Sequence, residues 1–396
     1  MPTPQRHVLY TTCLAHGLIH VFELSIPALL LLIQAEFSSD DLSMGKVAFA
    51  YSLLFGLGSL PAGWLVDRIG SRPLLIACLA GSSLSMVGMA LAPGFVAFTV
   101  AATMMGLFLS IYHPAGTALI THALPPSGRV FAWHGMAGNT GVAIASALAG
   151  VLGAAFGWRW AIGLLALLGI GATLSAARIP APTVTEIRSQ PGKGDARGFA
   201  LLLLTTAFMG MVYRGMTTFL PKFFALETSA NVERGTAVGG LLTTAALMVG
   251  LLGMYTSGRM IDRGRHPALV FLLGGLMQLP LLVVIRWIAG PALVPLFMSV
   301  AFFHFFTQPA GNKLVAQLTP PRLRGLGYGI YFLMTFGAGS FGAIVAGWIS
   351  AAFGLKQLFP LLAVLLLPSI LAITALWLYT RRRGLSTAAE EASGPL

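Results

Sequence analysis

Long apolar segments alternate with short polar loops along the whole chain. Each segment has about 20 residues or more, the length that a helix needs to cross the hydrocarbon core of a bilayer. Twelve segments follow this pattern, at residues 8–35, 43–66, 73–92, 95–123, 129–155, 158–178, 199–226, 236–258, 267–289, 291–318, 324–352 and 356–380. The sequence therefore predicts an all-α membrane protein with twelve transmembrane helices.

The longest polar stretch lies near the middle of the chain, at residues 179–198, and contains three prolines and several charged residues. We expect it to be a cytoplasmic linker between an N-terminal six-helix bundle, residues 1–178, and a C-terminal six-helix bundle, residues 199–380. Residues 381–396, which begin with three arginines, are expected to form a cytoplasmic tail.

Composition supports the membrane prediction. Of 396 residues, 56% are hydrophobic and 9% are charged, whereas soluble domains have about 25% charged residues. The net charge of +12 comes from basic residues in short loops, most of them on the side that would hold both termini. This distribution places both termini in the cytoplasm and gives no reason to expect nucleic acid as a partner. Cys13 and Cys78 lie within apolar segments and form no disulfide or metal-binding pattern.

The two halves of the chain repeat the same features at one spacing. Asp67 and Asp262 lie 195 residues apart, each followed by an arginine in a glycine-containing loop between two apolar segments. At the same offset His113-Pro114-Ala115-Gly116 matches Gln308-Pro309-Ala310-Gly311, and Arg129 matches Arg324. Each half has an even number of helices, so the halves share one orientation and are predicted to be parallel repeats.

The loop Gly63-Trp64-Leu65-Val66-Asp67-Arg68-Ile69-Gly70-Ser71-Arg72-Pro73 resembles the signature loop of the major facilitator superfamily of transporters. The second copy, around Asp262-Arg263, is one residue shorter. A narrower resemblance, to the fosmidomycin-resistance branch of bacterial drug exporters, rests on Ala15-His16, Tyr112-His113-Pro114 and Gly138-Asn139-Thr140-Gly141. The chain departs from that branch at Ile19-His20, where an Asn-Asp pair is typical.

The superfamily resemblance implies a gate on the cytoplasmic side. In the family, the signature aspartate accepts hydrogen bonds from a neighbouring helix end and from arginine, which ties the halves together. The alternative is that the basic loops only anchor the topology. The residues that the resemblance assigns to this gate are Gly63, Asp67, Arg68, Gly70, Arg72, Asp262, Arg263, Arg129 and Arg324.

Polar residues within the apolar segments are costly in a bilayer and are therefore candidates for function. His16, His20 and Glu23 follow one another at helical spacing and share one face of the first helix. Arg214, within the seventh segment, needs a partner, which we expect to be Glu23, an anionic substrate or each in turn. A permanent structural pair with Glu23 is the alternative. Glu23 and His20 are the candidates for proton coupling.

Other polar residues fall on the first, fourth, seventh and tenth helices, which the resemblance implies line a central cavity. His304, Gln308 and Asn312 recur every four residues in the tenth helix. The candidate cavity residues are His16, His20, Glu23, Tyr112, His113, Tyr213, Arg214, His304, Gln308 and Asn312. The fifth and eleventh helices are rich in glycine, and we expect them to form the rocking interface between the halves. The alternative is ordinary close packing with no motion.

These features predict a secondary active transporter of a bacterial inner membrane, working as a monomer by alternating access. We expect proton-coupled efflux of a small anionic or amphipathic compound, with proton-coupled uptake of an organic anion such as a carboxylate, or a transporter-like sensor, as alternatives. The chain contains no P-loop, so an ion gradient would supply the energy. His16 and His20 could ligate a metal in a membrane enzyme. However, His113 and His304 have no second histidine one turn away and no carboxylate cluster joins them, so we expect no enzyme activity, cofactor or metal.

Overall fold

The computed structural model describes residues 3–124, 128–180, 194–320 and 323–382. These residues form helices and connecting turns, and no strand occurs among them. Twelve helical segments of the described chain are long and apolar enough to cross a membrane. The predicted number and type of elements are therefore confirmed.

The described residues of the first half form nine helices, some of which are pieces of one membrane span. They are α1 Thr3–Ala28, α2 Leu30–Phe37, α3 Asp41–Leu57, α4 Ser59–Ile69, α5 Ser71–Ala90, α6 Phe95–Leu109, α7 Tyr112–Ala123, α8 Gly128–Phe156 and α9 Trp158–Ala177. The candidate spans Asp41–Ile69 and Phe95–Thr121 each combine two of these pieces.

The second half is built in the same way. Its helices are α10 Ala196–Thr228, α11 Val232–Asp262, α12 Pro267–Val284, η1 Ile285–Trp287, η2 Gly290–Ala292, α13 Leu293–Leu318, α14 Arg324–Phe332, η4 Leu333–Gly337, η5 Ala338–Ser340, α15 Phe341–Phe353, η6 Leu355–Gln357 and α16 Leu358–Arg382. Of these, η4 is a π-helical turn, a local widening that often marks functional sites.

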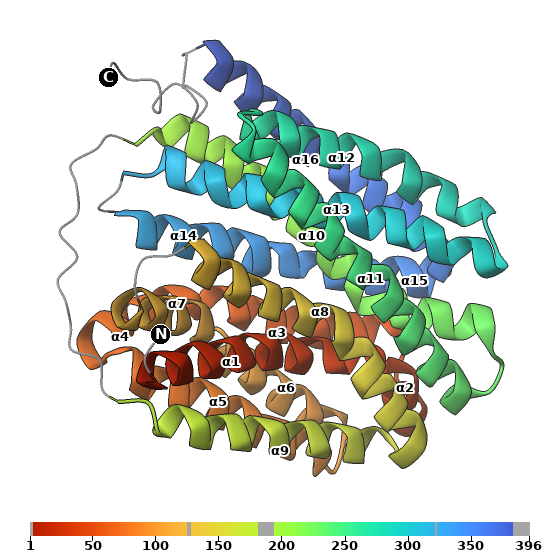
Figure 1. Ribbon diagram of the computed structural model, residues 1–396. Helices are drawn as coiled ribbons and strands as arrows, with labels where there is room; N and C mark the ends of the chain where they lie inside the picture. The colour runs from red at the N-terminus through yellow and green to blue at the C-terminus, as the bar shows by residue number, and fades with distance from the viewer. Residues whose placement is uncertain (1–2, 125–127, 181–193, 321–322, 383–396) are drawn as a thin grey trace, which may run out of the picture.

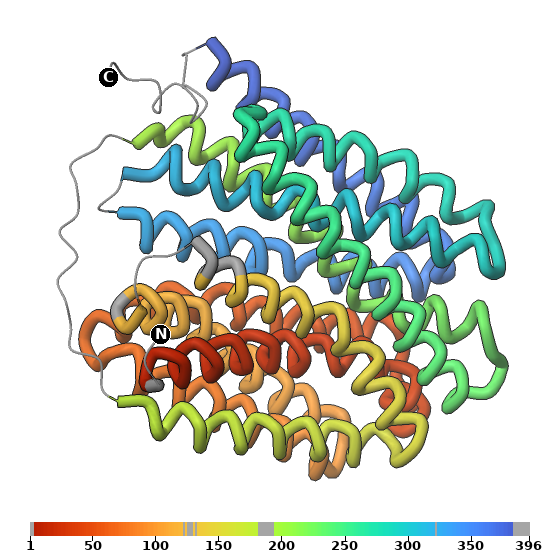
Figure 2. The backbone as a smooth tube through the Cα atoms, viewed as in Figure 1, coloured from red at the N-terminus to blue at the C-terminus, as the bar shows by residue number. Residues whose placement is uncertain are grey.

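The two halves of the chain form two helix groups that lie against each other. In Figure 1, α1 to α9 lie together in red to yellow-green, and α10 to α16 lie together in green to blue. The tube in Figure 2 shows that the start of α1 and the end of α16 lie on the same side of the molecule, toward the left of the view. We call this the basic side, because it holds the loops that follow Arg68 and Arg263, and we call the other end the opposite side.

The first membrane span differs from the predicted segment 8–35. Its α1 ends at Ala28, and the short α2 continues after Leu29. Pro27 lies in the last turn of α1, where its ring cannot donate the backbone hydrogen bond of a regular helix. Ser38, with a φ of 49°, then ends α2. The polar stripe of α1 therefore ends before this break.

Glycines bring the two halves into contact along α3–α15 and α8–α11. A Cβ on Gly45 would lie 2.7 Å from the carbonyl oxygen of Ala343, and one on Gly150 would lie 2.7 Å from that of Thr236. No side chain larger than hydrogen fits at either position without a shift of backbone. These close contacts lie toward the opposite side of the molecule, where α3 and α11 begin.

The expected glycine-rich interface is confirmed for part of the fifth and eleventh spans and is wrong for the rest. Gly337 faces Gly56 of the other half, and Gly347 faces Gly45. Gly138 and Gly141 instead pack on α1, and Gly339 and Gly342 pack on α10, each within its own half. Small residues at one spacing serve both purposes, so sequence does not separate them.

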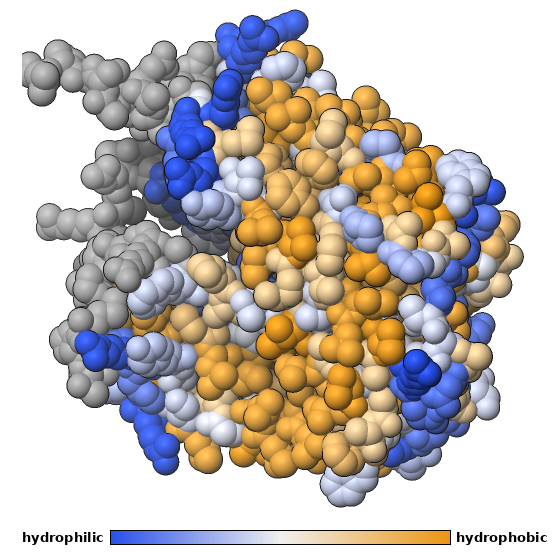
Figure 3. Space-filling model, turned by 45° about the vertical axis from the view of Figure 1, so that its right-hand side comes forward, coloured by the Kyte–Doolittle hydropathy of each residue, from blue (hydrophilic) through white to orange (hydrophobic). Residues whose placement is uncertain are grey.

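The outer surface matches a membrane environment. Figure 3 shows a broad apolar band across the middle of one face, with polar residues gathered toward its ends. Many large apolar side chains are exposed, for example Leu91, Val96, Trp160 and Leu371. Lipid tails provide the apolar surroundings that such a surface needs.

Candidate functional site

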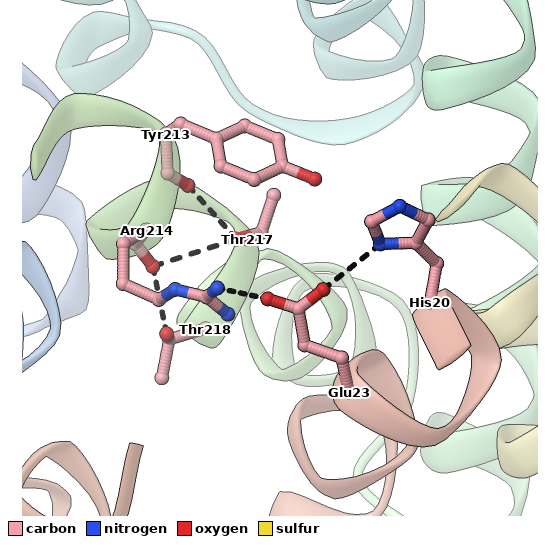
Figure 4. Close-up of polar contacts among 6 residues, drawn as sticks. All are labelled: His20, Glu23, Tyr213, Arg214, Thr217 and Thr218. Carbon is pink, nitrogen blue, oxygen red and sulfur yellow. Dashed lines mark hydrogen bonds and ion pairs between the residues drawn. The ribbon is translucent and has the colours of Figure 1, made fainter. Parts of the chain in front are cut away.

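A buried ion pair joins the two halves near the middle of the spans. An Nη2 of Arg214, on α10, donates to Oε1 of Glu23, on α1, and both residues are 1% exposed. The other carboxylate oxygen of Glu23 accepts from Nδ1 of His20 at 3.0 Å. Figure 4 shows the three side chains in one row, with Glu23 between its two donors. The predicted partnership of Glu23 and Arg214 is thus present in the structure.

Local helix geometry explains this arrangement. Residues three or four apart on α1 share one face, so His20 reaches the carboxylate of Glu23 from the turn before it. On α10, the Thr218 hydroxyl donates to the backbone carbonyl of Arg214 at 2.7 Å. A buried charge in a bilayer is stable only with a partner. Here Glu23 and Arg214 are each other's partners across two helices, and His20, one turn away, adds a second donor to Glu23.

The ion pair leaves some hydrogen-bonding capacity unused. Nη1 of Arg214 and the hydroxyl of Tyr51 are buried and have no hydrogen-bond partner in the described part of the chain. The two residues are neighbours, with the guanidinium carbon 5.7 Å from the centre of the Tyr51 ring. Buried donors without partners are rare. One free donor on the Arg214 cation and another on the neighbouring Tyr51 favour binding of a further acceptor, such as a carboxylate.

Histidines cluster beside the ion pair in the first half. His16 Nδ1 lies 2.8 Å from the carbonyl oxygen of His134, on α8. The Tyr112 hydroxyl, on α7, donates to the carbonyl oxygen of Thr12 at 2.5 Å and lies 2.9 Å from His134 Nε2. His113, next to Tyr112, has a ring centre 5.4 Å from that of His16. The structure therefore brings His16, Tyr112 and His113 together, as the sequence predicted.

Aromatic rings from both halves enclose His113. Its ring stacks on Phe332 of α14, with centres 4.8 Å apart and planes 16° apart. Phe336 and Phe55 also face it, at 6.0 Å and 5.9 Å. His113 therefore sits where the halves meet, and its Nε2 has no hydrogen-bond partner among the described residues.

In the second half, His304 lies against Tyr213, the residue before Arg214 in the sequence. Their rings stack with centres 5.0 Å apart and planes 15° apart. His304 Nδ1 lies 3.2 Å from the amide nitrogen of Gln278, on α12. Because an amide nitrogen only donates, this contact makes Nδ1 of His304 the acceptor. Gln278 is fully buried and belongs to the site although the sequence analysis did not select it.

The predicted stripe of the tenth span is not wholly at this site. Gln308 is half-buried and its side chain forms no hydrogen bond with another described residue, and Asn312 is exposed. Asn312 lines a separate cavity of about 310 Å³ toward the basic side, together with Asp262, Lys313 and Tyr328. The four-residue spacing carries each successive side chain one turn, about 6 Å, farther from His304, so the stripe extends well beyond the ion pair.

The two arginines of the first signature loop make their contacts within the first half and not with the ion pair. Arg68 stacks on Trp64 at 3.9 Å, and Arg72 donates to the carbonyl oxygen of Ala177 at 2.5 Å, both within the first half. Gly70 has a φ of 86° and ends α4, and Gly63 has open space around it.

The predicted tie through the signature aspartates is not seen in this conformation. Asp67, Asp262, Arg263 and Arg324 are exposed. In the described ranges no ion pair links Asp67 or Asp262 to an arginine. The backbone of Arg129 belongs to α8, but its side chain lies outside the described residues.

A polar network does join the halves at the opposite side, and the sequence analysis missed it. Asp41, at the start of α3, accepts from Lys222 Nζ of α10 at 2.5 Å and from the Ser350 hydroxyl of α15 at 2.5 Å. Gln34 bonds to both Asp41 and Lys222, each at 2.9 Å. The sequence shows a charged residue near the end of each of two spans, Asp41 and Lys222. Only the fold shows that these two residues meet.

Known proteins resemble the chain along nearly its full length. It is 24% identical over 374 residues to a probable galactarate/D-glucarate transporter of Pseudomonas putida, covering 82% of this chain and 80% of that one. It is 25% identical over 356 residues to a puromycin resistance protein of Streptomyces alboniger, covering 82% and 64%.

A solved structure shares the fold. It is a bacterial homologue of the human lysosomal transporter Spinster in an inward-facing, occupied conformation, with a TM-score of 0.79, 18% identity and coverage of 95% of this chain and 97% of that one. The model of the Major Facilitator Superfamily matches residues 13–285 and 234–396. With twelve candidate spans in two repeats, the chain is a multi-pass membrane protein that belongs to the Major Facilitator Superfamily of transporters.

Proposed function

We propose that this protein is a secondary transporter of a small organic anion, with Arg214 as the group that binds the carboxylate. The observation that carries the proposal is the buried ion pair between Glu23 and Arg214, with Nη1 of Arg214 still without a partner. A carboxylate that enters beside Tyr51 finds two free donors, Nη1 of Arg214 and the Tyr51 hydroxyl. Charge-assisted bonds of this kind are the strong ones in proteins.

Exchange of partners at Arg214 links binding to movement of the halves. Glu23 and Arg214 belong to different halves, so their pair holds the halves together in this conformation. A substrate anion that takes over Arg214 releases Glu23 and weakens that connection. Only a ligand with different affinities for two conformations can shift their populations, and competition for Arg214 provides the difference.

The ends of the molecule support alternating access. The halves are joined at the opposite side by Asp41, Lys222 and Ser350, whereas the signature aspartates carry no ion pair in the described residues. We therefore propose that this conformation is closed at the opposite side, and that residues 1–178 and 199–380 move as two units joined by the linker 179–198. The excess of Lys and Arg on the basic side favours a cytoplasmic location for both termini in an inner membrane.

The direction of transport, proton coupling through Glu23 and His20, and the monomeric state remain predictions from the sequence. Efflux of an amphipathic drug is a second candidate function. It is favoured by the aromatic rings of Phe55, Phe332 and Phe336 around His113 and by the similarity to a puromycin resistance protein. The first candidate is favoured by Arg214 and by the similarity to a galactarate/D-glucarate transporter.

Ligand binding to the purified protein tests the proposal. Galactarate is compared with the uncharged six-carbon polyol galactitol and with puromycin, by thermal shift and calorimetry. We expect the dicarboxylate to bind and the polyol not to bind. Arg214→Gln should abolish that binding, whereas Arg286→Gln, a change of an arginine beside Trp287, should leave it intact. Equal binding of galactarate to wild type and Arg214→Gln would exclude Arg214 as the anion site, and binding of puromycin alone would favour drug efflux.

A further inference from the structure

Three histidine rings from two helices converge in the first half. His16 and His20 lie one turn apart on α1, and His113 lies in the first turn of α7. One ring nitrogen from each residue lies within 4.8 Å of the others, and the ring centres are 5.3, 5.4 and 5.8 Å apart. We propose that these three histidines bind a divalent transition-metal ion, such as Zn²⁺, through their imidazole nitrogens.

Hydrogen bonds fix which nitrogen each α1 histidine offers. His16 Nδ1 lies 2.8 Å from the carbonyl oxygen of His134, which can only accept, so Nδ1 carries the proton and Nε2 keeps its lone pair. His20 Nδ1 lies 3.0 Å from Glu23 Oε2. Glu23 also accepts from Arg214, so its carboxylate is ionised and His20 Nδ1 donates. Nε2 is therefore the nitrogen that each of these two histidines has free to bind a metal.

This pattern is the one that metal-binding histidines show. Such a histidine nearly always donates its second ring N–H to a carboxylate or a backbone carbonyl, which orients the ring and makes the other nitrogen a better ligand. His20 has the carboxylate and His16 has the carbonyl. The sequence analysis predicted no metal because His113 has no second histidine one turn away, and the fold instead brings His113 to His16 and His20.

His113 contributes an unexplained polar atom. Its Nε2 is buried and has no hydrogen-bond partner among the described residues. The ring is held between Phe332 and Phe55, at 4.8 Å and 5.9 Å, so its direction is constrained by packing. A buried nitrogen without a partner calls for a ligand, and a metal ion between the three rings would satisfy it.

The geometry allows a bound ion after a small adjustment. Zn–N distances of about 2.0–2.1 Å in a tetrahedral site place neighbouring ligand nitrogens about 3.3 Å apart. The three nitrogens lie within 4.8 Å of one another, so side-chain rotations that move each nitrogen by on the order of 1 Å would close the site. Gly138 packs directly against the His16 ring, and any Cβ there would occupy its place. The glycine thus makes room for that ring.

The ligand set limits the kind of metal. Imidazole nitrogens suit zinc, copper, nickel and cobalt, whereas calcium and magnesium require oxygen ligands. Three protein ligands also leave a fourth position open, as in zinc sites that exchange a water molecule or a small anion. The negative charge next to the site comes from Glu23, which connects His20 to Arg214 of the other half. A metal on Nε2 of His20 would therefore be linked, through the imidazole ring, to the same carboxylate that holds the halves together.

Metal binding to purified full-length protein, stripped with a chelator and free of substrate, tests the proposal. Co²⁺ is titrated and followed by its visible absorption, which is intense for a four-coordinate ion, and Zn²⁺ binding is followed by calorimetry. We expect one ion per chain, displacement of Co²⁺ by Zn²⁺ and no binding of Mg²⁺. His113→Gln should weaken binding at least tenfold. His304→Gln, which alters a buried histidine of the other half, is the matched control and should bind as wild type does.

Several results would overturn the proposal. They are the absence of a stoichiometric ion in the wild type, equal affinity in wild type and His113→Gln, or an equal loss in His304→Gln. If His113→Gln does not give monodisperse protein, X-ray absorption at the zinc edge of the wild type decides instead. A shell with the multiple scattering of about three imidazoles supports the site, and a shell of oxygen ligands alone excludes it. None of these measurements involves transport, so they do not depend on the organic-anion proposal.

Discussion

Arg214 and Glu23 lie on different halves of the protein and are 191 residues apart, yet they form a buried ion pair. His20 adds a second hydrogen bond to the same carboxylate. The pair is both a connection between the halves and the proposed place of substrate binding. Changes on its two sides should therefore have opposite effects on ligand affinity.

Glu23→Gln should strengthen the binding of an organic anion, because it removes the group that competes for Arg214. We expect an increase in affinity of about tenfold, and loss of binding in Arg214→Gln, both measured by calorimetry with galactarate. Glu23→Gln should also lower thermal stability, since a buried cation without its partner costs about 3–5 kcal/mol. Weaker anion binding in Glu23→Gln would contradict the exchange of partners.

The double variant Glu23→Gln, Arg214→Gln separates the two effects. With both charges removed, no unpaired ion remains in the membrane, so much of the lost stability should return. Anion binding should not return, because the cation is absent. A double variant as unstable as the sum of the single variants would mean that the two side chains do not interact.

Asp41→Asn should loosen the opposite side of the molecule. The carboxylate accepts from both Lys222 and Ser350 of the other half, and partly buried charged hydrogen bonds contribute roughly 1.5–3 kcal/mol. A cysteine placed near this end should react faster with a water-soluble maleimide in the variant than in wild type. Glu227→Gln breaks the 3.0 Å pair with Lys356 within one half and is the matched control. Equal labelling of wild type and Asp41→Asn would mean that this network does not hold the end closed.

Gly45→Ala should destabilise the contact between α3 and α15. The new Cβ would lie 2.7 Å from the carbonyl oxygen of Ala343, and overpacking of this kind typically costs about 1–3 kcal/mol. Gly163→Ala on α9 is the control, since no other group lies within 4 Å of its Cβ position. Thermal melts in detergent should show a lower midpoint for Gly45→Ala and an unchanged or higher one for Gly163→Ala. The reverse order would show that the halves do not pack this closely.

Asp40→Ala should remove a stabilising contribution that depends on pH. Hydrogen bonds from Ser43 hold the pKa of the Asp40 carboxyl below its ordinary value of 3.8. Its stabilisation of the α3 N-terminus is therefore present above that value and is lost as the pH falls through the lowered pKa.

At neutral pH the loss of this cap should cost about 1 kcal/mol, and the difference from wild type should shrink in acid. Asp40→Asn retains a capping side chain but does not titrate, so its stability relative to Asp40→Ala should not vary with pH. Thermal melts of the three proteins between neutral and acid pH give the comparison. A gap between wild type and Asp40→Ala that stays constant in acid would contradict the role of the ionised cap.

The fold could be predicted from the sequence because each membrane span is one continuous run of apolar residues. Apolar length gave the twelve spans, and the repeat around Asp67 and Asp262 gave the two halves. Helical spacing also placed His20 and Glu23 on one face, and the cost of a buried charge indicated that Arg214 needed Glu23. Helical spacing depends only on residues within one segment, and the cost of a buried charge depends on one group, so both can be judged from the sequence alone.

Contacts between distant segments were harder to predict. His113 meets His16 and His20 only because α7 packs on α1, and Gln278 meets His304 only because α12 packs on α13. The prediction that Asn312 lies at the same site as His304 was wrong for a related reason. Residues on one face of a long helix share a direction, but they lie at different depths and have different neighbours. The gate expected at Asp67 came from resemblance, and the structure has its polar connection at Asp41 instead.

The glycine contacts between the halves have a further consequence. Close backbone contacts, as at Gly45 and Gly150, leave room for only a few side-chain hydrogen bonds across them, such as those at Thr244 and Ser350. The energetic balance between one arrangement of the halves and another then rests on few polar groups, chiefly Arg214 with Glu23 and Lys222 with Asp41. We therefore expect a change of charge at either pair to shift the balance between one arrangement of the halves and another.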